Sequence, residues 1–217
     1  PMHQVVVKDG TFTPEVKSYI FRLIGKTAHA AEPEKGINPS LAIAEILQGA
    51  DQLSSNQLED LALITPIHII MGKAAYGVSA GQAELHFTLR SYLPERMQRL
   101  ETALNNLVKK TVLSKQLQLN SNSLEEFKAN INDAKSVGFI RHAAQKLDLD
   151  ILEIDYPMPW GEDFGAFTQQ FSGAIFGLGA GEDCPALHNP DYDFPEVLIE
   201  TGIHLFWGII QQIQQNA

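Results

Sequence analysis

The sequence is poor in cysteine, in basic residues and in long apolar runs. Cys184 is the only cysteine among 217 residues, so no intrachain disulfide can form, which fits a reducing, cytoplasmic compartment. Lys and Arg number 16 against 26 Asp and Glu, and the net charge of −10 disfavours nucleic acid or an anionic membrane as a partner. No apolar run approaches the roughly 20 residues that span a bilayer, and no secretory signal opens the chain.

Residues 14–126 carry the pattern of a self-contained domain. Alternating apolar and polar residues, clearest from Gln82 to Arg90, predict strands, and apolar residues at helical spacing predict helices. Strands are expected at residues 16–24, 61–71, 82–92 and 117–122, and helices at residues 39–53 and 94–113. The order strand, helix, strand, strand, helix, strand is that of the split βαβ, ferredoxin-like unit.

The remaining residues, 1–13 and 127–217, have the composition of an α/β domain. Strands are expected at residues 4–7, 150–154 and 174–178, and helices at residues 134–147, 164–171 and 195–214. Three strands are too few for a complete doubly wound sheet. We therefore expect this part of the chain to be an incomplete α/β domain.

The strongest candidate for chemistry is His188, in the loop that follows the expected strand at residues 174–178. α/β proteins place functional groups on loops at the ends of core strands, and neutral imidazole is the commonest protein ligand of zinc-like ions. The alternative is a loop histidine that hydrogen-bonds to its neighbours. Cys184 lies four residues earlier, but the chain has no second cysteine to complete a Cys/His metal pair.

Glu162 and Asp163 lie at the start of the helix expected at residues 164–171. Acidic side chains at this place can serve a nearby site, or they can simply stabilise the helix dipole. The sequence leaves both interpretations open.

His29 and Arg90 are the candidates within residues 14–126. His29 lies in a loop of small residues, which lets another backbone or a ligand approach closely; the alternative is a histidine held by a local hydrogen bond. Arg90 ends an expected strand on its polar face, where a solvated arginine is the default. The other histidines are interpreted as structural or surface residues: His3, His68, His86, His142 and His204.

Three motifs resemble one enzyme family, in the right order along nearly the whole chain. They are the His29 loop from Gly25 to Pro39, the strand end Thr88-Leu89-Arg90-Ser91, and Glu162-Asp163-Phe164 followed by Leu187-His188-Asn189-Pro190. They are similar to the lid and the last two motifs of metallo-amidohydrolases of the aminoacylase and hippurate-hydrolase type. The plant indoleacetyl-amino-acid hydrolases are close kin of that family.

The resemblance implies a catalytic domain with two adjacent divalent metal ions, zinc or manganese, and an inserted ferredoxin-like lid that makes a homodimer. It implies that His188 is the last metal ligand, with Glu162 and Asp163 near the site. It also implies that His29 enters the partner subunit's site and polarises the scissile carbonyl, and that Arg90 helps to hold the substrate carboxylate. The substrate would be an N-acyl amino acid or a related amide.

The sequence departs from the family's pattern in three ways. Tyr76-Gly77-Val78 lacks the asparagine that relatives carry before the third lid strand, which puts a substrate contact there in doubt. Trp160-Gly161 stands where relatives often have Gly-Ser. The family's upstream metal ligands and its paired glutamates, which include the general base, do not occur. The resemblance therefore implies a lid plus the closing part of a catalytic domain, inactive and without bound metal as an isolated chain.

Two other functions remain open. One is a non-catalytic module that dimerises through its ferredoxin-like domain without metal or hydrolysis. The other is a metal-independent hydrolase with Cys184 as the nucleophile beside His188, which thiol alkylation would inactivate.

Overall fold

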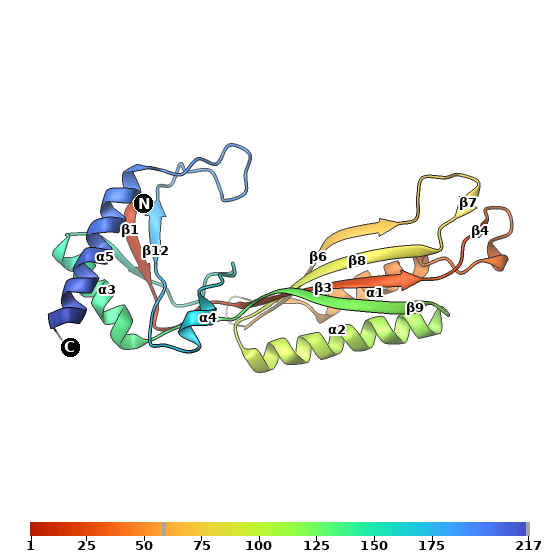
Figure 1. Ribbon diagram of the computed structural model, residues 1–217, viewed down its shortest axis with the longest axis horizontal. Helices are drawn as coiled ribbons and strands as arrows, with labels where there is room; N and C mark the ends of the chain where they lie inside the picture. The colour runs from red at the N-terminus through yellow and green to blue at the C-terminus, as the bar shows by residue number, and fades with distance from the viewer. Residues whose placement is uncertain (58–59, 216–217) are drawn as a thin grey trace. The chain divides into compact units, whose positions relative to one another are not determined.

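The computed structural model describes residues 1–57 and 60–215, and the chain divides into two compact units (Figure 1). Unit 1 combines Pro1–Thr13 with Asn130–Ala217, and unit 2 is Pro14–Ala129. Both units contain helices and strands, so the α/β class expected from the sequence is confirmed.

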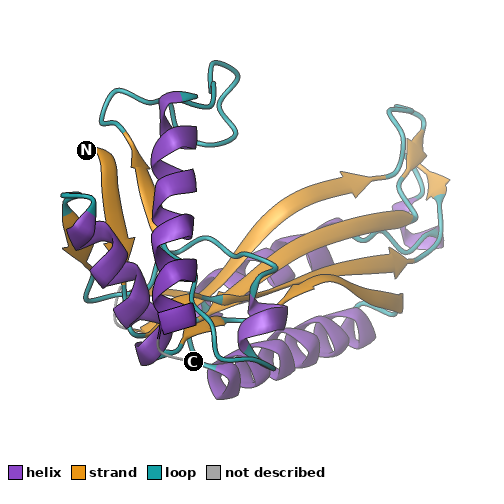
Figure 2. Cartoon of the chain, turned by 60° about the vertical axis from the view of Figure 1, so that its left-hand side comes forward, coloured by secondary structure: helices purple, strands orange, loops and turns teal. Residues whose placement is uncertain are grey.

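Unit 2 is an antiparallel five-stranded sheet covered by two helices on one face. The strands lie in the order β5 (Ser55–Gln57), β6 (Asp60–Met71), β8 (Gln82–Ser91), β3 (Glu15–Ile24) and β9 (Gln118–Phe127). The helices α1 (Ser40–Leu53) and α2 (Pro94–Ser114) pack against the sheet, as Figure 2 shows.

The core of unit 2 follows from the strand alternation. Leu85, Phe87 and Leu89 of β8 are completely buried against the helices, while the residues between them are half-buried on the other face. Ile46 of α1 and Leu104 of α2 complete the contact from the helix side. Burying side chains of this size stabilises the unit by roughly 2 kcal/mol each.

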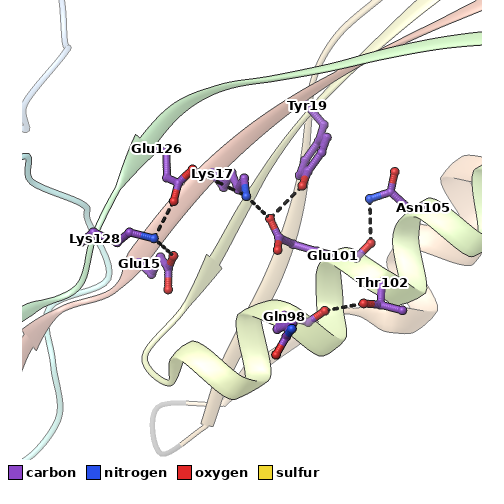
Figure 3. A network of polar contacts seen from close by, with 9 residues as sticks. All are labelled: Glu15, Lys17, Tyr19, Gln98, Glu101, Thr102, Asn105, Glu126 and Lys128. Atoms are coloured by element: carbon purple, nitrogen blue, oxygen red, sulfur yellow. Dashed lines mark hydrogen bonds and ion pairs between the residues drawn. The ribbon is translucent and has the colours of Figure 1, made fainter.

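A network of polar side chains joins β3, β9 and α2 at the edge of this core (Figure 3). The Lys17 ammonium lies 2.7 Å from a Glu101 carboxylate oxygen, and the Tyr19 hydroxyl donates to the same oxygen at 2.8 Å. The hydrogen bond to Glu101 raises the pKa of Lys17. The pKa of Tyr19 is raised mainly by burial of the phenol and, to a smaller extent, by its hydrogen bond to Glu101. These shifts favour the protonated lysine and phenol, so the network holds the α2–sheet contact at neutral pH.

Unit 1 is built on a three-stranded sheet in the order β11 (Ile151–Glu153), β1 (Met2–Val7) and β12 (Gly177–Ala180). β1 runs parallel to β11 and antiparallel to β12. The helices α3 (Ala134–Lys146) and α5 (Val197–Gln215) cover one face, where Val5 and Val7 meet Val137 and Leu205 (Figure 1).

Shorter elements complete both units. In unit 1, β2 (Gly10–Thr13) pairs with β10 (Asn130–Asn132), and α4 is one turn long (Gly165–Thr168). In unit 2, β4 (Ala28–His29) pairs with β7 (Val78–Ser79), and a single 3₁₀ turn, Pro33–Lys35, follows. Within the described residues, no helix is both long and apolar enough to cross a membrane.

The strand expected at residues 174–178 begins later than its sequence suggests, at Gly177. The reason is that Asn132 replaces a strand partner: its Nδ2 donates to the Ile175 carbonyl at 2.8 Å, and its Oδ1 accepts from the Ile175 N–H at 2.9 Å. Extended backbone whose groups are satisfied by a side chain has no need of a neighbouring strand. The helix expected at residues 164–171 is likewise reduced to the single turn of α4.

Candidate active-site residues

His29 lies in a loop of unit 2 beyond the ends of β3 and β8. Through the β4–β7 pairing, His29 stands opposite Val78, and the Ala30 N–H donates to the Gly77 carbonyl at 3.0 Å. The loop therefore has two short backbone strands of its own, although its side chains are mostly exposed.

Glycines set the base of this loop because its backbone segments approach too closely for a side chain. Lys26 and Ile37 exchange two backbone hydrogen bonds, of 3.0 and 2.8 Å. A Cβ atom on Gly25 would lie 2.1 Å from the Ile37 carbonyl oxygen, and one on Gly36 would lie 2.8 Å from the Lys26 carbonyl oxygen. Neither distance is possible without moving backbone, so the position of the His29 loop depends on these glycines.

One hydrogen bond orients the His29 ring. The Ala31 N–H donates to its Nδ1 at 3.1 Å. Because Nδ1 accepts, a neutral imidazole must carry its proton on Nε2. The local hydrogen bond considered as an alternative from the sequence is therefore present, and it leaves an exposed Nε2–H donor on the other side of the ring.

Arg90 occupies the far end of the same sheet. It lies on β8 opposite Val16, near the start of β3, whereas His29 follows the end of β3 at Ile24. Eight residues of strand separate Val16 from Ile24, which is roughly 25 Å at the usual rise. Burial lowers the pKa of the Arg90 guanidinium, which nevertheless stays charged at neutral pH because an arginine side chain is effectively always protonated. His29 and Arg90 of one copy thus cannot touch the same small molecule.

His188 lies in an exposed loop of unit 1, between β12 and α5. Its backbone is in the left-handed region at a φ of 71°, and the next N–H, of Asn189, donates to the Ala186 carbonyl at 3.1 Å. A non-glycine residue in this region costs roughly 1 kcal/mol. Within the described residues, no hydrogen bond or ion pair involves the His188 side chain. The alternative of a histidine held by its neighbours therefore has no contact to support it.

Glu162 and Asp163 are both exposed, and neither side chain caps a helix. α4 begins at Gly165, and its N-cap residue is Phe164, without a side-chain cap hydrogen bond. A side-chain cap hydrogen bond therefore does not explain these two acidic residues, which directly precede the N-cap residue of α4.

Asn130 holds the backbone at Glu162 in place, and the sequence analysis did not identify Asn130 as a residue of the site. Its side chain is completely buried, and its Nδ2 donates to Thr13 Oγ1 at 2.6 Å and to the Glu162 carbonyl at 3.2 Å. Asn132 lies two residues further along the same strand face and holds Ile175 in the same way. The signal was present as Asn-Ile-Asn, an alternation that places two amides on the core face of a strand.

The described residues bring together no complete metal site. In residues 1–57 and 60–215, no group of three or more His, Cys, Asp or Glu side chains lies in a geometry that could hold a metal ion. His188, Glu162 and Asp163 belong to unit 1, and His29 and Arg90 belong to unit 2. The residues present do not fit a two-metal centre by themselves; His188 offers a single imidazole.

Comparison with known proteins places these residues in a wider context. Residues 7–212 match the model of peptidase family M20/M25/M40. The N-acetyldiaminopimelate deacetylase of Lactobacillus helveticus is 26% identical over 219 residues, which cover 97% of this chain and 55% of that protein. The deacetylase of the same name from Bacillus subtilis is 24% identical over 211 residues, 96% of this chain and 56% of that protein.

Solved structures share the fold. A dinuclear metal-binding peptidase of the M20 family from Bacillus subtilis matches 96% of this chain and 52% of its own, with a TM-score of 0.74 at 19% identity. The aminobenzoyl-glutamate utilization protein of Klebsiella pneumoniae matches 96% of this chain and 51% of its own, with a TM-score of 0.72 at 16% identity. The chain spans about half the length of the proteins it matches.

Proposed function

Because the chain belongs to peptidase family M20/M25/M40, we propose that it is part of a metal-dependent amidohydrolase that cleaves the amide bond of N-acyl amino acids. The observation that carries the proposal is the oriented, exposed Nε2–H of His29 on a loop with a glycine-dependent base. The deacetylase and peptidase names of the relatives support the same class of bond.

We propose that unit 2 is the lid and that unit 1 is the closing part of the catalytic domain. The order β3, α1, β6, β8, α2, β9 supports a ferredoxin-like topology for the lid. Unit 1, with three strands in its main sheet, is small for a catalytic α/β domain.

His29 would act on the carbonyl oxygen of the scissile amide. That oxygen gains negative charge when water attacks the carbonyl carbon, and the Nε2–H would donate to it. A donor held ready by the Ala31 N–H needs no reorganisation at the moment of attack. Removing one such donor typically lowers kcat by about 100- to 1000-fold.

Arg90 would hold the carboxylate of the amino-acid portion. A guanidinium can bind a carboxylate through two parallel hydrogen bonds, and partial burial strengthens that contact by excluding water. Since His29 and Arg90 of one copy are roughly 25 Å or more apart, one substrate could meet both only if they come from two copies. This separation supports a homodimer in which each active site receives His29 from the partner.

The free edge of β6 supports the lid as the dimer contact. β5 covers only the start of β6, and among the described residues no strand pairs with the outer edge from Leu63 to Met71. Large apolar side chains are exposed on this half of the strand: Ile67, Ile69, Ile70 and Met71. An open apolar edge is a surface that a second copy can pair with by two-fold symmetry.

His188 is the one residue that we propose as a ligand of zinc or manganese. The remaining ligands and the general base would have to come from polypeptide outside this sequence, since the chain itself assembles no metal site among its described residues. The isolated chain should therefore bind no stoichiometric metal and hydrolyse neither N-acetyl nor N-benzoyl amino acids. Metal binding with chelator-sensitive hydrolysis by the isolated chain would overturn this division.

The test of the catalytic proposal is His29→Ala in the enzyme that contains this chain together with the upstream metal ligands. We expect kcat to fall by about 100- to 1000-fold with metal content unchanged, because His29 is not a ligand. His142→Ala, at an exposed histidine on α3 that lies outside the proposed site and the proposed dimer contact, serves as the control. An unchanged kcat for His29→Ala would remove His29 from the mechanism.

A further inference from the structure

The helix α5 exposes a continuous apolar stripe that faces away from the core of unit 1. Its residues follow one another at intervals of four, three, four and three, and Trp207 lies beside them. We call them together the α5 seam: Ile199, Ile203, Phe206, Trp207, Ile210 and Ile213. Their side chains are between 45% and 61% exposed, so the described part of the chain covers the seam only in part, as where the Phe176 ring meets that of Phe206.

The opposite side of α5 is already used. Leu198, Leu205 and Gln212, spaced seven residues apart, are buried. Leu205 packs in the core with Val5 and Val7 of β1, and the Gln212 Nε2 donates to the Phe139 carbonyl of α3 at 3.3 Å. Only a narrow strip that includes Glu200, His204 and Gln211 is polar and exposed. A helix that is apolar on two sides is typical of one buried on two sides.

Resting on the proposed function, we infer that the α5 seam is the docking surface for an amphipathic helix of the polypeptide that completes the M20 catalytic domain. Alternate intervals of three and four are the pattern by which one helix packs along another. At roughly 100 Å² of exposed surface per side chain, the seam offers roughly 600 Å², close to one partner's share of a specific interface. The chain spans about half the length of its relatives, so the other half of each relative is long enough to supply a helix that covers this area.

The surroundings of the seam favour such a helix. A cavity of about 500 Å³ adjoins it, lined by Phe139 of α3, by Phe164 and Phe176, and by Phe206 and Ile213 of the seam. Large side chains of an incoming helix could fill this groove between α3 and α5.

A lipid surface is a poorer occupant. Helices that lie on membranes carry Lys and Arg on their polar face. α5 contains no Lys or Arg, it carries Glu200, and the whole chain has a net charge of −10. Glu200 and the negative net charge of the chain instead favour a docking helix with basic residues beside its apolar stripe.

The first test uses a synthetic probe, a 21-residue peptide with leucines at alternating four- and three-residue intervals and lysines on its flanks. It is added to the chain carrying Trp160→Phe, so that emission reports Trp207 alone. We expect a blue shift that saturates with peptide, and loss of binding by at least tenfold in Ile203→Glu/Ile210→Glu. Gln211→Glu, on the polar strip, should bind no more weakly than the parent, because the added negative charge attracts the lysines of the probe. No saturable shift, or equal binding by the seam variant, overturns the proposal.

The second test asks whether the missing domain is the occupant. The segment that precedes the matched region in the Bacillus subtilis deacetylase is fused ahead of Pro1, in a Cys184→Ser background. A probe cysteine placed by Ile203→Cys should be alkylated at least tenfold more slowly in the fusion than in the isolated chain, whereas Gln211→Cys should react equally in both. Equal rates for Ile203→Cys overturn the proposal. Protection of Ile203→Cys in the isolated chain that grows with concentration also overturns it, because the occupant is then a second copy.

Metal content and hydrolysis, measured on the same fusion, separate this inference from the proposed function. Protection of Ile203→Cys without hydrolysis supports the docking surface and contradicts the proposed activity. Hydrolysis without protection supports the proposed activity and refutes the docking surface.

Discussion

Gly25→Ala should weaken unit 2 and displace the His29 loop. The new Cβ would lie 2.1 Å from the Ile37 carbonyl oxygen and 2.8 Å from the Leu117 side chain. Relief requires Ile37 to move, which breaks its two hydrogen bonds with Lys26. Two hydrogen bonds at about 1 kcal/mol each, with about 1 to 3 kcal/mol for the overlap, give a loss of about 3 to 5 kcal/mol. That is a large part of the roughly 5 to 15 kcal/mol that stabilises a domain.

The assay is urea unfolding of the chain followed by far-ultraviolet circular dichroism, with hydrogen exchange to locate the change. The Lys26 and Ile37 amides should lose protection first, because their hydrogen bonds are the ones that break. Gly77→Ala is the matched control, since a Cβ there meets nothing within 4 Å. If Gly25→Ala and Gly77→Ala unfold at the same urea concentration, the glycine contacts do not set the loop and the reasoning fails.

Three further perturbations test other parts of the molecule. Asn132→Ala removes three hydrogen bonds, to the Lys8 carbonyl and to both backbone groups of Ile175, and should lower the free energy of unfolding in urea by about 2 to 4 kcal/mol. Asn189→Ala, at an exposed asparagine, should lower it little, and equal unfolding midpoints for the two variants would contradict the role of Asn132. The hydrogen bonds from Arg141 lower the pKa of Glu153, so this pair stabilises the fold above the ordinary glutamate pKa of about 4.3, and its contribution disappears as pH falls through the lowered value. Between pH 7 and pH 3 the melting temperature of Arg141→Gln should therefore fall by less than that of the parent. An equal fall would exclude the pair as a cause of acid destabilisation. Ile69→Lys on the open edge of β6 should make the protein monomeric in analytical ultracentrifugation, whereas Leu152→Lys in unit 1 should not; a persistent dimer would move the interface away from β6.

The long periodic elements could be predicted from the sequence, and the short ones could not. The strand at residues 82–92 and the helix at 94–113 correspond closely to β8 and α2, because their apolar spacing is sustained over many residues. β4 and β7 have two residues each, too few to show any period. They exist because Gly25, Gly36 and Gly81 let distant backbone segments approach, which is a property of tertiary contact rather than of local pattern.

The candidate residues show the same limit. The sequence singles out His29 and His188 by residue type and by resemblance, but it cannot give the tautomer of His29, which depends on the Ala31 N–H, or the left-handed backbone of His188. Asn130 escaped notice because a buried amide becomes informative only when its partners, Thr13 and Glu162, are known. Both partners lie far from it in the sequence.

His29 and His188 have one physical property in common: the backbone around each is fixed by hydrogen bonds, and the side chain is exposed. His29 has one ring nitrogen bound by its loop and the other exposed, and His188 has no side-chain partner among the described residues. A lone imidazole ligand and an unsatisfied donor do no chemistry alone, since metal binding needs three or four ligands and an oxyanion donor needs a substrate. The open edge of β6 and the α5 seam are two places where several exposed large apolar side chains lie on one element. The two proposals, a second lid at β6 and a complementary catalytic segment at α5, would together complete the polar site and cover these apolar surfaces.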